Sequence, residues 1–147
     1  MNDCLTLQHV LHDEIPLTRT IGIRVTQCDA QGVCLSAPLE PNINHKCTAF
    51  GGSLYSIAVL CGWSFVYQQM KRHHLSGHIV IQQSEVQYAL PVDGEITAIC
   101  TSNDEAMLEK FITTYKRRGR ARIKLQVKIV YKNQDAMTFD GQYVVHK

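Results

Sequence analysis

The sequence predicts an α+β fold, in which a curved antiparallel sheet wraps around one long central helix. Residues 53–72 place apolar side chains around much of a helical surface and contain no carboxylate. The segments on both sides of this helix alternate apolar and polar residues, as strands do. Short polar turns separate several of these strands, and a hairpin needs far fewer residues than a parallel crossover. An antiparallel sheet with helices gathered on one face accommodates every segment.

The first part of the chain predicts a short amphipathic helix and then two strands. Leu7, Val10 and Leu11 recur at helical spacing. Pro16 ends this helix, because proline has no N–H to donate and favours extended geometry in the residue before it. Alternating apolar residues then predict strands over residues 21–26 and 33–37, joined by a turn at residues 29–32.

A loop connects these strands to the central helix. Pro41, Asn42 and Asn44 oppose regular structure within residues 39–50, and Gly51 and Gly52 open the helix. The helix is expected to be nearly enclosed by the sheet. Its apolar positions are Leu54, Ile57, Ala58, Cys61, Phe65 and Val66.

The second half predicts two strands, a shorter helix and two more strands. Along residues 78–90 the apolar positions change parity, which predicts a β-bulge near Gln83. Ser102, Asn103 and Asp104 are the alternatives for the N-cap of the shorter helix. The remaining predicted elements are a strand at residues 96–100, the helix at 107–115, a strand at 121–131 and a final strand at 137–145.

Length and composition predict a single domain spanning residues 1–147, since 45% of the residues are hydrophobic and can form one core. The formal charge of +2 is too small to indicate a nucleic-acid partner.

The N-terminus carries Asp3, Asp13 and Glu14 where a signal peptide needs apolar residues, and residues 54–67 are too short to cross a bilayer. Six scattered cysteines without a CxxC pair are expected to be free thiols, which favours the cytoplasm.

Two segments resemble a known family. The segment NINHKCTAFGGSLYSIAVLCGW (residues 42–63) and the segment VQYALPVDGEITAIC (86–100) are similar to the thioesterase family named for the YiiD C-terminal domain, within the hotdog-fold thioesterases. The diglycine helix start and the Tyr-x-x-Pro-Val-x-Gly pattern are widespread among hotdog proteins and support the fold. The Asn-x-Asn-His loop followed by Phe-Gly-Gly-Ser-Leu-Tyr is narrower.

The resemblance implies an acyl thioesterase of fatty acid metabolism. Its substrates would be acyl thioesters of coenzyme A or acyl carrier protein, bound at a subunit interface of a homo-oligomer, either a dimer or a tetramer, without a cofactor. One departure matters: many hotdog enzymes carry an Asp or Glu on the central helix or in its preceding loop, whereas no acidic residue lies between Glu40 and Glu85. Val59 stands about where phenylacetate-type hotdog thioesterases place an aspartate. Another group must therefore activate water, or the protein binds acyl chains without hydrolysing them.

Thioester hydrolysis needs a donor for the developing oxyanion and a group that orients or deprotonates water. The free N–H groups of the helix start can bind an anion, although two glycines can also serve only a tight turn. Histidine is the side chain best suited to act as a general base near neutral pH, so His45 is the candidate general base, with Asn44 beside it. Asn44 can equally well act as an ordinary turn residue. The predicted catalytic residues are Asn44, His45, Gly52 and Ser53, and the predicted substrate-binding residues are Asn42, Thr48, Phe50, Gly51, Ser56 and Glu85.

Other chemistries have weaker support. Cys61 has no cationic neighbour on the helix to lower its pKa, and a GxSxG elbow is absent from the sequence. No metal site is expected, because the sequence has no CxxC or HExxH spacing. The basic segments 71–74 and 116–122 are interpreted as solvated surface, with contact to the phosphates of a coenzyme A or carrier-protein arm as the alternative. A 3-hydroxyacyl thioester dehydratase and a non-enzymatic acyl-binding module are the competing functions.

Overall fold

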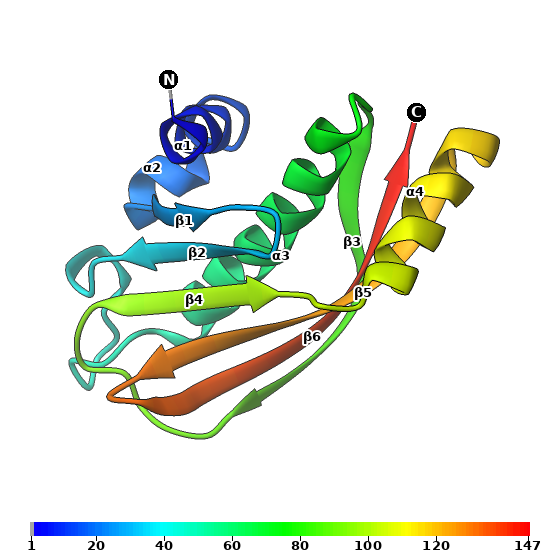
Figure 1. The fold of residues 1–147 in the computed structure, drawn as a ribbon. Coiled ribbons are helices and arrows are strands. Elements are labelled where there is room, and N and C mark those ends of the chain that lie inside the picture. The colour runs from blue at the N-terminus through cyan, green and yellow to red at the C-terminus, as the bar shows by residue number, and fades with distance from the viewer. Residues whose placement is uncertain (1) are drawn as a thin grey trace.

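Helix α3 (Gly51–Arg72) lies against one face of a curved six-stranded sheet (Figure 1). The computed structural model describes residues 2–147. All neighbouring strands are antiparallel, in the order β1-β2-β4-β5-β6-β3, so the predicted α+β arrangement is confirmed. The strands are β1 (Arg24–Cys28), β2 (Gly32–Ala37), β3 (His78–Tyr88), β4 (Ile96–Thr101), β5 (Arg120–Tyr131) and β6 (Gln134–His146).

The other helices cover the two ends of the sheet. Asp104 is the N-cap of α4 (Glu105–Arg118), because its side chain accepts a hydrogen bond from the N–H of Met107 at 3.0 Å. Asp104 was one of the three predicted alternatives. Asn2 is the N-cap of helix α1, and its side chain accepts a hydrogen bond from the N–H of Leu5. The helices are α1 (Asp3–Glu14), α2 (Leu17–Ile21), the 3₁₀ turn η1 (Glu40–Asn42) and α4 (Glu105–Arg118). None of the helices within residues 2–147 has both the length and the apolar character needed to cross a membrane.

The prediction that the first strand begins at Ile21 is wrong. Ile21 is the last residue of α2, and Gly22 ends that helix with a left-handed φ of 83°. The strand begins at Arg24 instead. Ile21 and Ile23 are both buried, so their alternation with Gly22 satisfied the strand pattern although a helix ends between them.

The core lies between α3 and the sheet. Ile57, Ala58, Cys61, Phe65 and Val66 are buried on the helix, as the apolar pattern predicted. They pack with the inward residues of the strands in one continuous cluster. Burying apolar surface at about 25 cal/mol per Å² is the main source of stability for such an arrangement. The core therefore holds α3 in a fixed position under the sheet.

The predicted bulge near Gln83 is confirmed, because the register of β3 against β6 shifts between Ile81 and Gln83. Beyond the bulge, Ser84 contacts Tyr55 of α3 and Val86 packs against the core, whereas Glu85 is exposed on the outer face. Both β1 and β3 are edge strands. Helix α1 covers β1, and the side chain of Gln8 accepts a hydrogen bond from the N–H of Val25 at 3.0 Å.

Candidate functional site

The N-terminal end of α3 presents three unpaired backbone donors. Phe50 precedes the helix in an extended conformation and provides no side-chain cap. The first main-chain hydrogen bond of the helix joins the N–H of Leu54 to the carbonyl of Phe50 at 3.0 Å. Within residues 2–147 no acceptor lies at the N–H groups of Gly51, Gly52 and Ser53. Together with the positive end of the helix dipole, these groups favour an anion.

A small apolar cavity of about 340 Å³ lies beside this helix end. The last residues of β3 and the segment after it form one wall, and the start of α3 forms the other. Gly51 is one of its lining residues, so a ligand can place an apolar group in the cavity and a polar atom near the N–H of Gly51. Its lining residues are Ala49, Gly51, Leu54, Tyr88, Ala89, Leu90 and Pro91.

Tyr88 joins β3 to the helix end. Its hydroxyl donates a hydrogen bond to the carbonyl of Gly51 at 2.9 Å. Partial burial is the main reason that the pKa of Tyr88 is raised. The hydroxyl is therefore protonated at neutral pH and can donate a hydrogen bond. The sequence prediction used this tyrosine only as a mark of the fold and missed its place in the site. The Tyr-x-x-Pro-Val-x-Gly pattern, in which Tyr88 is the first residue, is the sequence signal that could have placed this tyrosine in the site.

Asn44 closes the loop before α3. Its side-chain oxygen accepts from the N–H of Lys46 at 2.8 Å and of Thr48 at 3.1 Å. Its amide nitrogen donates to the hydroxyl of Thr48 at 2.9 Å. Cys47 completes the turn with a left-handed φ of 62°. These bonds fix the loop that carries His45, which gives both Asn44 and Thr48 a structural task.

Asn42 anchors the beginning of the same loop. Its side chain is 2% exposed, and its amide donates to the carbonyls of Ile21 and Pro38 at 2.9 and 2.8 Å. Its own carbonyl accepts from the N–H of Phe50 at 2.7 Å. The amide group is therefore directed into the protein and away from the cavity.

The remaining predicted residues of this region lie at the surface around the helix end. His45 is exposed and makes no hydrogen bond within residues 2–147. Phe50 is 56% exposed. Ser53 is half-buried in the first turn, whereas the hydroxyl of Ser56 donates to the carbonyl of Gly52 at 2.9 Å. His45 and Phe50 are thus accessible to a ligand, and Ser56 satisfies its own helix.

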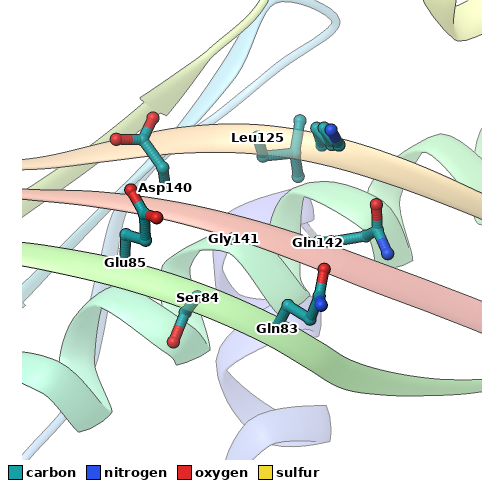
Figure 2. Close-up of a pocket in the computed structure, with 8 residues that line it drawn as sticks. Gln83, Ser84, Glu85, Leu125, Asp140, Gly141 and Gln142 are labelled. Carbon is teal, nitrogen blue, oxygen red and sulfur yellow. The ribbon is translucent and has the colours of Figure 1, made fainter.

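Glu85 lies apart from this group. Figure 2 shows its side chain beside that of Asp140, while Ser84 points the other way. Glu85 and Asp140 are direct partners in the pairing of β3 with β6. The hydroxyl of Ser84 lies 2.6 Å from that of Tyr55 on α3. Glu85 is on the outer face of the sheet, where it lines an open hollow of about 560 Å³ together with Asp140 and Gly141 (Figure 2).

The cysteine thiols are free, as predicted, and the two most buried ones are poorly suited to attack a substrate. The Cys61 thiol donates to the carbonyl of Val33 at 3.5 Å. Burial raises the pKa of Cys61 well above its usual value and raises that of Cys100 to about 12. Both remain protonated at neutral pH, and only a thiolate is a good nucleophile.

Within residues 2–147 no three His, Cys, Asp or Glu side chains cluster closely enough to hold a metal ion.

The chain has the hotdog fold, in which an antiparallel sheet surrounds a central helix. It is similar over 98% of its length to a protein of unknown function from Chlorobaculum tepidum TLS, with 35% identity, 94% of that chain covered and a TM-score of 0.92. It is similar to the "putative thioesterase" from Shewanella oneidensis with 29% identity, coverage of 98% and 97%, and a TM-score of 0.88. A mutant thioesterase from Pseudomonas aeruginosa shares the fold at 12% identity, coverage of 99% and 95%, and a TM-score of 0.75.

The family follows from the sequence match. Residues 4–147 match the model of the family described as "Putative thioesterase (yiiD_Cterm)". The chain belongs to this family, as its resemblance implied.

Proposed function

We propose that the protein is an acyl thioesterase that hydrolyses acyl thioesters of coenzyme A or acyl carrier protein at the N-terminal end of α3. The three unpaired N–H groups of Gly51, Gly52 and Ser53 beside an apolar cavity carry this proposal. The family and the hotdog fold support the same reaction. The free cysteines suit the reducing cytoplasm. The proposed acyl thioester substrates place the reaction in fatty acid metabolism.

The proposed reaction places the thioester carbonyl oxygen at the N–H groups and the acyl chain in the cavity. His45 removes a proton from a water molecule as the water oxygen attacks the carbonyl carbon. The carbon–oxygen double bond becomes an oxyanion, which the N–H groups stabilise. When the carbonyl forms again, the carbon–sulfur bond breaks and the imidazolium returns its proton to the thiolate. The products are a carboxylic acid and a free thiol.

A second copy of the chain is part of this proposal. The edge of β3 is uncovered, and two copies can pair antiparallel along it to extend both sheets. The exposed large apolar side chains near the cavity mouth give such a pair an apolar interface. These side chains are Ile43, Phe50, Tyr88 and Leu90. The neighbouring copy would then complete the wall of the cavity, and Glu85 on β3 would lie near the same interface.

An acyl-binding module is the second candidate. No carboxylate is among the residues that line the cavity, so the usual acidic group of hotdog enzymes is missing from it. The same lack weakens the dehydratase hypothesis more strongly, because dehydration needs an acid and a base together. Binding without turnover distinguishes this candidate from the thioesterase.

The decisive experiment measures thiol release from short, medium and long acyl-coenzyme A substrates and from acylated carrier protein. Release above the uncatalysed rate is the expected result. If no substrate releases thiol while acyl-coenzyme A still binds, the chain is a binding module and the thioesterase proposal is wrong.

Two variants test the named residues. His45→Ala is expected to lower kcat by about 10²–10⁴, the usual contribution of a general base. Asn44→Ala is expected to lower kcat severely as well, because it removes the bonds that hold the His45 loop. His73→Ala, an exposed histidine beyond the other end of α3, is the matched control and retains full activity. Unchanged turnover in both His45→Ala and Asn44→Ala would rule out this site.

A further inference from the structure

A second hollow, of about 700 Å³, lies between α4 and the first half of β5. Strand β4 pairs with β5 only as far as the Cys100–Val127 pair. From Arg120 to Gln126, β5 therefore has a strand partner on one side alone, which is β6. Helix α4 packs beside this free edge (Figure 1). Residues of α4 line one side of the hollow.

Five cationic side chains surround this hollow, and no acidic residue lines it. Lys110 and Arg118 come from one face of α4, where the lining positions recur every three or four residues. None of the five belongs to an ion pair within residues 2–147, whereas Lys128 on the same strand pairs with Asp135 at 3.0 Å. The five cations are Lys110, Arg118, Arg120, Arg122 and Lys124.

The floor of the hollow is apolar. Phe111 and Ile123 form its base but are each only 3% exposed, so the half-buried Met107 offers the more accessible apolar surface. The carboxylates of Glu105 and Glu109 are on α4 but do not line the hollow. A concave site with an apolar floor and several unpaired cations suits a small ligand that has a flat ring and more than one negative charge. Arginine side chains in particular bind phosphate oxygens in pairs.

We propose that this hollow binds a phosphorylated nucleotide, namely the 3′-phospho-ADP end of coenzyme A. The purine ring lies on the apolar floor, and the cations neutralise the 3′-phosphate and the diphosphate. The volume is within the usual range of small-molecule pockets, and five cations around one hollow suit the clustered phosphates of a nucleotide. As a statement about the substrate of the proposed thioesterase, this inference rests on the proposed function.

The position of the hollow relates it to the cavity at α3. Arg122 pairs with Val144 of β6, which pairs with Val80 near the start of β3, whereas the α3 cavity adjoins Tyr88 at the end of β3. Along the strand direction, the two sites thus lie toward opposite ends of β3. When two copies pair antiparallel along β3, the strands of one copy run opposite to those of the other. The hollow of one copy then lies toward the same end of the joined sheet as the α3 cavity of the other. A coenzyme A molecule would then span the two subunits.

Calorimetric titration with 3′-phospho-ADP at low salt tests the hollow without any thioester. The wild-type chain is expected to bind it, and the double variant Arg118→Gln/Arg122→Gln to bind at least tenfold more weakly. Arg117→Gln is the matched control, because Arg117 is exposed on the same helix turn and does not line the hollow. If the wild type does not bind, or if the double variant binds as well as the control does, the proposal is wrong.

Kinetics separate this proposal from the proposed function. In the double variant, KM for acyl-coenzyme A is expected to rise at least tenfold, whereas turnover of the corresponding acyl-pantetheine, which lacks phosphate, stays unchanged. An equal loss with both substrates would contradict a nucleotide site. If wild-type protein hydrolyses neither substrate but the titration shows the expected loss, the thioesterase proposal fails and the nucleotide site stands. An acidic carrier protein that binds at the hollow while 3′-phospho-ADP does not would also overturn the inference.

Discussion

Helix α3 carries glycine at its tip and at its middle, and the two positions differ in their surroundings. A Cβ atom on Gly62 would overlap the hydroxyl oxygen of Tyr143, which is fully buried. A Cβ atom on Gly51 would lie 3.5 Å from the ring of Tyr88, an ordinary contact, and one on Gly52 would meet the exposed ring of Phe50. Glycine at the middle is therefore required for packing, whereas glycine at the tip leaves the N–H groups accessible.

Alanine substitutions make this difference measurable. Gly62→Ala is expected to lower the free energy of unfolding by about 1–3 kcal/mol, because the new methyl group overpacks a site that cannot yield. Gly52→Ala is expected to change it by about 0.5 kcal/mol or less, since the exposed Phe50 ring can turn aside. Urea unfolding of both variants gives the comparison. Equal losses in the two variants would contradict the distinction between middle and tip.

Removal of the Tyr143 hydroxyl sharpens the account of Gly62. This hydroxyl donates to the carbonyl of Val59 at 2.7 Å, so Tyr143→Phe alone is expected to cost about 1 kcal/mol. In combination with Gly62→Ala the same change removes the closest overlap. The double variant is then more stable than the sum of the single effects predicts, by about 0.5 kcal/mol or more in a double-mutant cycle. Strict additivity would show that Gly62 is sensitive for another reason.

The smallest effect is expected at the tip. Tyr88→Phe removes an exposed hydrogen bond to the Gly51 carbonyl and keeps the ring that lines the cavity. The unfolding free energy is expected to change by about 0.5 kcal/mol or less. Thioester turnover is expected to fall less than about tenfold, which corresponds to roughly 1.4 kcal/mol of barrier. A larger loss of turnover would assign the Tyr88 hydroxyl a direct role with the substrate.

Much of the fold was predictable because side-chain periodicity reports burial directly. The change of parity along β3 correctly located its bulge. Helix α2 was missed because five residues are too few to show helical periodicity. Ile21 and Ile23 are buried whichever element contains them, so their alternation did not distinguish a strand from the end of a helix.

The candidate site was predictable only in part. The loop and the helix start were visible as a Pro, Asn and Gly cluster, but the contact of Tyr88 with Gly51 joins residues 37 positions apart. Hydrogen-bond partners also could not be read from residue types. Asn42 and Asn44 are chemically identical, yet one is buried under α2 and the other closes the loop around His45. Only the tertiary arrangement distinguishes these tasks.

The most direct test of the central claim deletes one N–H group at the tip of α3. Proline is accepted at the first position of a helix, and the extended conformation of Phe50 suits a residue before proline. Gly51→Pro is therefore expected to keep its unfolding midpoint while kcat for thioester hydrolysis falls by about 10²–10³. Gly51→Ala, which retains the N–H, is expected to keep most of the activity. An unchanged kcat in Gly51→Pro would contradict a role of this N–H in binding the oxyanion.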